Sequence, residues 1–229
     1  MVKIETKFML SKKRAFDLLS SISILVLIIP FGILSYPFLM FLIGKPIIFK
    51  QERIGKNGKK FKLYKLRSMK ANAQSIKNKY LTKNEAPLPM FKMAEDPRFI
   101  KKEIIFFGIK KPKIVRVGKF LSSSGIDEIP QFLNILKGEM SLIGPRPLPV
   151  DEAEALEKID KNWYKWRHEV RPGIFSVWAA DSKHNKSLNY WKKLEKETLS
   201  LSFEKQILVI FKIIFKQIKN IFHILKERL

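Results

Sequence analysis

A long uncharged segment near the N-terminus constrains this chain more than any other feature. No residue from Leu18 to Gly44 is charged, and the segment is rich in Leu, Ile and Phe. A membrane-spanning helix needs about 20 apolar residues, so this segment is long enough to enter a bilayer. It is too long for the apolar region of a cleaved signal peptide, and no small-residue cleavage motif closes it. The sequence therefore predicts a membrane-inserted helical segment.

The charges on both sides of this segment predict its topology. Residues 1–17 contain five Lys or Arg against two acids, and residues 45–70 contain ten against Glu52 alone. Flanks rich in Lys and Arg stay on the cytoplasmic side, and one straight span cannot place both flanks there. Pro30 and Pro37 lie inside the segment, where proline removes a helix hydrogen bond and bends the axis. We expect residues 1–48 to form a re-entrant helix–break–helix hairpin with its break at Pro30; a kinked single span is the alternative.

The net charge requires an anionic partner. The chain has 45 Lys and Arg against 21 Asp and Glu, which gives a formal charge of +24. Nucleic acid, an anionic membrane surface and a phosphorylated substrate are all compatible with this charge. The absence of cysteine excludes disulfides, a thiolate nucleophile and Cys-based metal sites. Neither a P-loop nor a Rossmann glycine motif occurs.

Three segments indicate how the rest of the chain is organised. Residues 61–67 alternate apolar and basic residues after a turn at 53–58, which predicts a half-buried strand with one basic face. Residues 70–95 are polar and predict a mobile helix and loop. Residues 201–229 place Lys205, Lys212, Lys216 and Lys219 on one stripe of a helix, opposite apolar residues. We expect this helix to lie on anionic inner-leaflet lipids, with a terminal helix packed on the core as the alternative. Residues 49–200 then form a cytosolic domain.

The strongest candidate for chemistry is the acidic pair Asp127 and Glu128. Pro130 is tolerated only in the first turn of a helix, so a helix should begin close to Asp127 and end at Gly138. At that positive helix end a carboxylate stays ionised, which suits a nucleophile or a Mg²⁺ ligand. An ordinary acidic N-cap is the alternative.

Basic residues gather among turn residues around this pair. Arg146 lies between two prolines, and Arg171 precedes Pro172 and Gly173. Such turns present a guanidinium at a low entropic cost. The group predicted to bind phosphate consists of Arg53, Lys65, Arg67, Arg146, Arg167 and Arg171.

Several motifs then occur together in a fixed order. They are Lys13-Arg14-x-x-Asp17, Phe49-Lys50-Gln51-x-Arg53-x-Gly55, Tyr64-Lys65-x-Arg67-Ser68-Met69, Asp96-Pro97-Arg98, Asp127-Glu128-x-Pro130-Gln131, Asn134-x-x-Lys137-Gly138-x-Met140-Ser141-x-x-Gly144-Pro145-Arg146-Pro147 and Arg167-His168-x-x-Arg171-Pro172-Gly173-Ile174. In this order they resemble the bacterial sugar transferases, the monotopic polyprenol-phosphate phosphoglycosyl transferases. The resemblance extends from about Lys12 to Trp178.

This resemblance implies a fold and a reaction. The fold is an α-rich α+β structure with a re-entrant membrane helix and a small catalytic domain with short strands, on the cytoplasmic face of the bacterial membrane. Asp127 would attack the β-phosphate of a UDP-sugar, releasing UMP, and undecaprenyl phosphate would then take the phosphosugar. Glu128 would help to hold Mg²⁺. The product would begin a surface polysaccharide such as a capsule or exopolysaccharide, with no nucleic-acid partner; a homodimer is compatible with the sequence.

Two other functions would also be compatible with the basic character of the chain. A basic membrane scaffold or a membrane-tethered nucleic-acid-binding protein would also explain the charge, but neither explains an acidic pair beside so many arginines. Residues 101–113 exceed the usual link of the family and place Phe106 and Phe107 in an apolar run between lysine pairs. We expect this insertion to dock on the bilayer, with a buried strand or plug as the alternative.

Overall fold

The computed structural model describes residues 2–93, 95–104, 113–181 and 187–226. Its α-helices are α1 (Val2–Ile43), α2 (Val117–Ser124), α3 (Gln131–Leu136), α4 (Val150–Ile159), α5 (Lys161–Arg167), α6 (Val177–Ala180), α7 (Leu188–Ser200) and α8 (Phe203–Lys226). Its strands are β1 (Ile48–Ile54), β2 (Lys60–Leu66), β3 (Lys102–Ile104), β4 (Lys113–Val115), β5 (Ser141–Ile143) and β6 (Gly173–Phe175). Short 3₁₀ turns are η1 (Lys56–Gly58), η2 (Lys77–Lys83) and η3 (Ile126–Glu128). The helix-rich α+β class is therefore confirmed.

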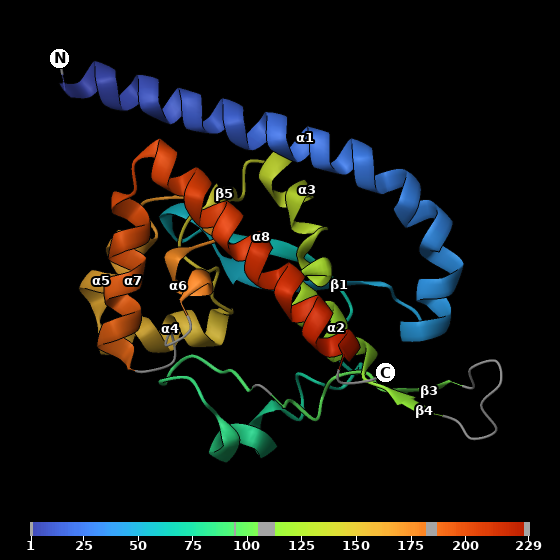
Figure 1. The fold of residues 1–229 in the computed structure, drawn as a ribbon. Helices are drawn as coiled ribbons and strands as arrows, with labels where there is room; N and C mark the ends of the chain where they lie inside the picture. Colours follow the sequence, from blue (N-terminus) through green and yellow to red (C-terminus); the bar gives the residue numbers. More distant parts are fainter. Residues whose placement is uncertain (1, 94, 105–112, 182–186, 227–229) are drawn as a thin grey trace.

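The long apolar segment forms one continuous helix. α1 includes both Pro30 and Pro37, and Figure 1 shows it running along one side of the domain before it bends towards its C-terminal end. The predicted break at Pro30 is wrong, because α1 continues through this residue. A proline can bend a helix without ending it when the flanking turns keep their hydrogen bonds. The part from Lys12 to Ile43 is long and apolar enough to cross a membrane by length and composition, and only 6% of its apolar window is buried.

The first basic motif fastens α1 to the domain. Asp17 is buried, and its carboxylate accepts hydrogen bonds from the Ser141 hydroxyl (2.7 Å) and from the backbone N–H of Leu142 (3.0 Å). Lys13 donates to a carbonyl of β5 (3.0 Å) and Arg14 to a carbonyl of α3 (2.8 Å). The motif therefore docks α1 onto β5 and α3.

Three two-stranded sheets support the site. β1 and β2 pair antiparallel over their full lengths, and Phe61 and Leu63 of β2 are buried, which confirms the predicted half-buried strand. β3 and β4 pair antiparallel, whereas β5 and β6 pair parallel. A side chain on Gly173 of β6 would overlap the backbone of Gly144, so the two segments approach closely because both residues are glycine.

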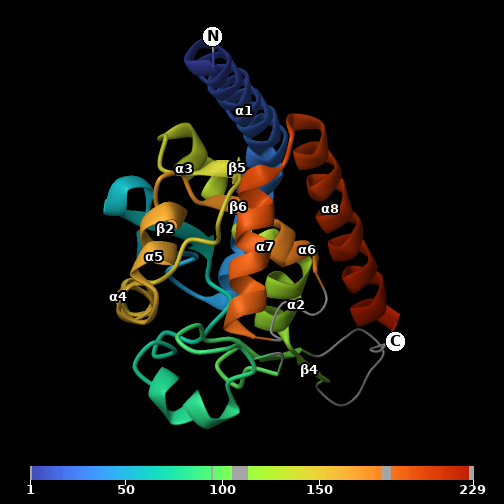
Figure 2. The same cartoon turned by 90° about the vertical axis from the view of Figure 1, so that its left-hand side faces the viewer.

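The C-terminal segment is helical, as predicted, and one of its faces packs on the domain. Figure 2 shows α8 along the outside of the domain, where it contacts α2 and α6. Ile213 is 4% exposed and belongs to the main core, so the alternative of a packed terminal helix holds for this face. Lys216 donates to the carbonyl of Ala179 (3.1 Å) and is not part of a solvated stripe. A second face exposes apolar residues at helical spacing: Leu208, Phe211, Phe215, Ile218 and Phe222.

The insertion begins and ends in an antiparallel hairpin formed by β3 and β4. Figure 1 places this hairpin near the C-terminal end of α1. The Lys102 ammonium lies 4.7 Å from the centre of the Phe41 ring of α1. Residues 105–112 lie outside the described part of the chain, and so does the predicted docking of Phe106 and Phe107.

Candidate active site

The acidic pair lies on a turn between two helices. Asp127 and Glu128 belong to η3, after α2 ends at Gly125, which has a φ of 74°. The helix α3 begins four residues after Asp127, at Gln131, and Gly138, with a φ of 81°, follows its end. The predicted helix and its stop are therefore present, and Asp127 lies on the 3₁₀ turn η3 that precedes the helix.

The strand β2 brings a cation to this turn. The Lys65 ammonium lies 3.0 Å from Glu128 Oε1 and 3.6 Å from Asp127 Oδ2. The side chain of Asn134 fixes the strand against α3, because it donates to the carbonyl of Lys62 (2.8 Å) and accepts from the N–H of Tyr64 (3.1 Å). The position of Lys65 therefore depends on the attachment of β2 to α3 as well as on the ion pairs of its own side chain.

Asp127 is buried and only partly satisfied. Its Oδ2 faces Lys65 and accepts a long hydrogen bond from the Ser68 hydroxyl (3.4 Å), whereas Oδ1 has no hydrogen-bond partner among the described residues. Burial raises the pKa of Asp127 to about 6; Lys65 opposes this shift and Glu128 adds to it. Burial thus outweighs the stabilising effect that we expected from the helix end, and the carboxylate is a stronger base than an exposed aspartate.

Glu128 differs from its neighbour. Burial would raise its pKa, but Lys65, Arg146 and Arg53 together lower it below the ordinary value. Its side chain is 23% exposed and reaches the pocket. The pair therefore combines a carboxylate of raised pKa with one of lowered pKa, a division of roles typical of catalytic carboxylates.

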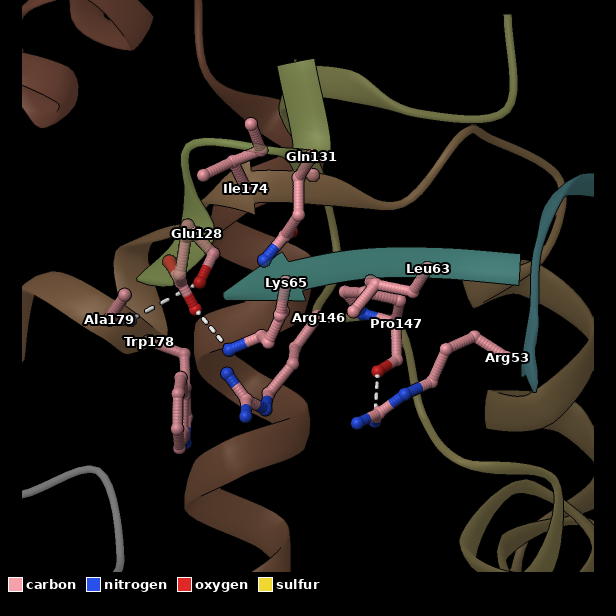
Figure 3. A pocket seen from close by; sticks show the side chains of 12 residues that line it. Arg53, Leu63, Lys65, Glu128, Gln131, Arg146, Pro147, Ile174, Trp178 and Ala179 are labelled. Carbon is pink, nitrogen blue, oxygen red and sulfur yellow. Dashed lines mark hydrogen bonds and ion pairs between the residues drawn. The ribbon is translucent and has the colours of Figure 1, made fainter. Parts of the chain in front are cut away.

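A pocket opens beside Glu128, and three basic side chains contribute to its wall (Figure 3). Arg53, Lys65 and Arg146 line it together with Trp178. The guanidinium of Arg53 is held by the carbonyl of Pro147 (2.9 Å) and by a side-chain oxygen of β1 (2.6 Å). Burial and the neighbouring charge of Arg146 lower the pKa of Arg53 to about 10. This concentration of positive charge favours a multiply charged anion.

Arg146 presents its guanidinium to this pocket. The guanidinium lies 5.2 Å from the centre of the Trp178 ring. It has no hydrogen-bond acceptor within the described ranges, so its donors are available to a ligand. Figure 3 shows Arg146, Lys65 and Glu128 converging on the same space.

The other three residues that were predicted to bind phosphate form contacts within the protein instead, and these contacts stabilise the fold. Arg67 donates to the carbonyls of Lys45 (2.8 Å) and Ile43 at the end of α1. Arg171 donates to the carbonyl of Gly138 (2.7 Å), and buried Arg167 forms an ion pair with a glutamate of α7. None of the three is among the residues that line the pocket.

Three residues with polar or aromatic side chains at the site were missing from the predicted set. Ser68 contacts Asp127, while Trp178 and Gln131 line the pocket. All three lie within or at the edge of the motif set, so their positions were visible in the sequence. Their side chains carry no charge, and a search for charged groups therefore passed over them.

The two carboxylates offer oxygen donors of the kind that a magnesium ion binds. The unpartnered Asp127 Oδ1 and the partly exposed Glu128 carboxylate are hard oxygen donors of the kind Mg²⁺ prefers. Across the described ranges, no group of three or more His, Asp or Glu side chains could hold a metal. Mg²⁺ commonly binds to one or two carboxylates and completes its shell with water and substrate phosphates.

Comparison with known proteins identifies the family. The model of the family described as bacterial sugar transferase matches residues 8–224. The chain belongs to the bacterial sugar transferase family. Several relatives of this chain are named as sugar phosphotransferases.

Three relatives illustrate the match. Galactosyl transferase CpsE of Streptococcus agalactiae is 40% identical over 62% of this chain and 27% of its own length. Undecaprenyl-phosphate galactose phosphotransferase of Salmonella typhimurium is 33% identical over 76% of this chain and 33% of its own length. UDP-glucose:undecaprenyl-phosphate glucose-1-phosphate transferase of Klebsiella pneumoniae is 30% identical over 91% of this chain and 40% of its own length. The chain thus spans less than half of each of these three relatives.

Proposed function

We propose that this protein transfers a sugar-1-phosphate from a UDP-sugar to undecaprenyl phosphate, in the first membrane step of surface polysaccharide synthesis. Family membership and the relatives' names support the reaction class. The observation that carries the proposal is the unpartnered Oδ1 of buried Asp127, next to a pocket lined by Arg53, Lys65 and Arg146. A scaffold or a nucleic-acid-binding protein would not need a buried carboxylate of raised pKa at a phosphate-binding pocket.

In the proposed mechanism Asp127 is the nucleophile. A carboxylate oxygen of Asp127 attacks the β-phosphorus of the donor; the bond to the bridging oxygen breaks, and UMP leaves with the electron pair. An oxygen of undecaprenyl phosphate then attacks the phosphosugar, which gives the undecaprenyl diphosphate sugar and frees the carboxylate. Lys65 and Arg146 stabilise negative charge on the transferred phosphoryl group. Glu128, with Asp127, would hold Mg²⁺, which when bound neutralises the diphosphate.

The test is a direct assay of the detergent-extracted protein. We expect UMP release when the protein is incubated with Mg²⁺, undecaprenyl phosphate and the correct member of a panel of UDP-sugars. One sugar should give a lipid-linked product in an amount equal to the UMP. Release of UDP instead of UMP, or no release with any donor while a family member is active in parallel, would contradict the proposal.

The membrane attachment is proposed to be monotopic. The basic flanks of α1 favour a re-entrant course with both ends on the cytoplasmic face, and a bent continuous helix can follow it. The exposed apolar stripe of α8 fits the headgroup region of an anionic leaflet. Both helices would hold the pocket close to undecaprenyl phosphate.

Cysteine labelling tests this topology. Because the chain has no cysteine, Lys7→Cys and Lys50→Cys each provide a unique thiol. Both should stay unlabelled when intact cells are treated with a membrane-impermeant thiol reagent, and both should be labelled after lysis. Labelling of either position from outside would show a true span.

Replacing Pro30 by Leu should straighten α1 and shift the chain towards that spanning form.

A further inference from the structure

A loop outside the sequence motifs lies beside Trp178, a residue of the pocket wall. Residues 84–92 form this loop, and the Asn84 side chain closes it. Asn84 Nδ2 donates to the carbonyls of Ala86 and Met90, both at 2.8 Å, and Oδ1 accepts from the backbone N–H of Lys92 at 2.9 Å. The backbone of Lys92 is therefore held in place by a side chain eight residues earlier.

The same loop is anchored in the core. Met90 is 1% exposed, and Ala86 is also buried. They belong to the cluster that contains Trp163, Trp178 and Trp191. Because the loop is fixed by both a polar closure and a buried apolar anchor, it holds a defined position beside Trp178, although its composition suggests a mobile segment.

This position brings a second cation to Trp178. The Lys92 ammonium lies 4.9 Å from the centre of the Trp178 ring, and the Arg146 guanidinium lies 5.2 Å from the same centre. Burial and the charges of Arg146 and Lys216 lower the pKa of Lys92 to about 8, although Glu85 and Glu128 oppose them. An anion between the two cations would relieve their repulsion.

The cations in and beside the pocket form two groups relative to Asp127. Lys65 lies 3.6 Å from Asp127 Oδ2, so the phosphate under attack belongs next to Lys65. Arg146 and Lys92 share the ring of Trp178, which lines the pocket. A nucleoside diphosphate sugar has a second phosphate, and a pocket that accepts this donor needs a second group of cations for it.

We propose that Lys92, together with Arg146 at the Trp178 ring, binds the nucleoside-side phosphate of the donor, the phosphate that departs in the nucleoside monophosphate. This assignment rests on the proposed function and adds a substrate-binding residue to it. Lys92 then discriminates between the two substrates. The donor carries this phosphate, whereas the polyprenol phosphate acceptor arrives after the nucleoside monophosphate has left and has no second phosphate.

The test compares Lys92→Met with Lys83→Met in the full-length, detergent-solubilised protein. Methionine keeps an apolar stem of similar length, and Lys83 is an exposed lysine of η2 that provides the same charge change outside the pocket. UMP affinity is measured by titration calorimetry, and KM is measured separately for donor and acceptor. We expect Lys92→Met to weaken UMP binding and raise the donor KM by about tenfold or more, as for a lost charge-assisted bond. The acceptor KM should change by less than about twofold, within the range of the Lys83→Met control.

Lys92→Arg should keep UMP affinity within about threefold of the wild type, because it preserves the cation on the same loop. Thermal denaturation shows whether each variant is folded, and a fold defect in Lys92→Met leaves Lys92→Arg as the deciding variant. Unchanged UMP affinity in Lys92→Met, an equal rise of both KM values, or tenfold weaker binding in Lys92→Arg would overturn the assignment. If the wild type neither binds nor releases UMP, the proposed function itself fails.

Discussion

Replacing Asp127 by Asn is expected to reduce UMP release by at least about a thousandfold, because an amide cannot form an acyl phosphate with the donor. Asn matches the buried side chain in shape, so the loss should be chemical and not structural. The direct measurement is single-turnover labelling. A donor with a labelled phosphosugar should leave its label on the wild type without acceptor, and peptide mapping should locate the label at Asp127.

The wild-type labelling rate provides a second readout of the same assignment. Because burial raises the pKa of Asp127 to about 6 in the metal-free protein, the rate should level off above about pH 6, where the carboxylate is ionised, and fall at lower pH; bound Mg²⁺ should shift this fall further down in pH. The control is Glu154→Gln, which removes an exposed carboxylate of α4 and should leave rate and profile unchanged. Glu128→Gln should weaken the Mg²⁺ dependence yet still give label at Asp127. Label on another residue would contradict the assignment.

The sequence predicted five charged residues that the structure places near one another. Glu128, Lys65, Arg53 and Arg146 were all predicted and line one pocket, and Asp127, also predicted, contacts Lys65 beside it. They could be found because several motifs in a fixed order identify the family, and charged residues in such motifs are strong candidates. The pKa of Asp127 could not be predicted in the same way, because it depends on burial by distant segments.

Sequence alone does not distinguish a phosphate-binding arginine from a structural one. Arg146 and Arg171 both occur next to proline in turns, yet only Arg146 faces the pocket. Arg171 donates to the carbonyl of Gly138, and Arg67 donates to carbonyls that end α1. Each of these acceptors is a backbone oxygen 20 or more residues from its arginine in the sequence. A pattern of side chains in the sequence does not identify such a partner. Lys92, which we propose as a donor-binding residue, was not predicted from the sequence. Its loop is polar and has no periodic pattern that would single out one lysine.

A buried glutamate supports the segment that carries Arg146. Glu195 of α7 is fully buried and accepts hydrogen bonds from the indoles of Trp163 (2.8 Å) and Trp191 (3.1 Å). It also accepts from Nε (3.0 Å) and Nη2 (2.9 Å) of Arg167. Arg167 in turn donates to the backbone carbonyl of Arg146 (2.7 Å). Glu195 thus links two tryptophans of the core to the segment that presents Arg146.

Glu195→Ala is expected to lower the free energy of unfolding by about 3–5 kcal/mol, because it leaves the Arg167 guanidinium buried without its counter-charge. Glu197→Ala is the matched control, since it makes the same change on an exposed face of the same helix and should cost less than about 1 kcal/mol. Both are measured by denaturation of the detergent-solubilised protein, followed by circular dichroism. A loss no larger than that of the control would show that Arg167 finds another partner or water. The predicted loss would instead show that Glu195 of α7, a helix that contributes no residue to the pocket wall, stabilises the fold through Arg167, which also binds the Arg146 carbonyl.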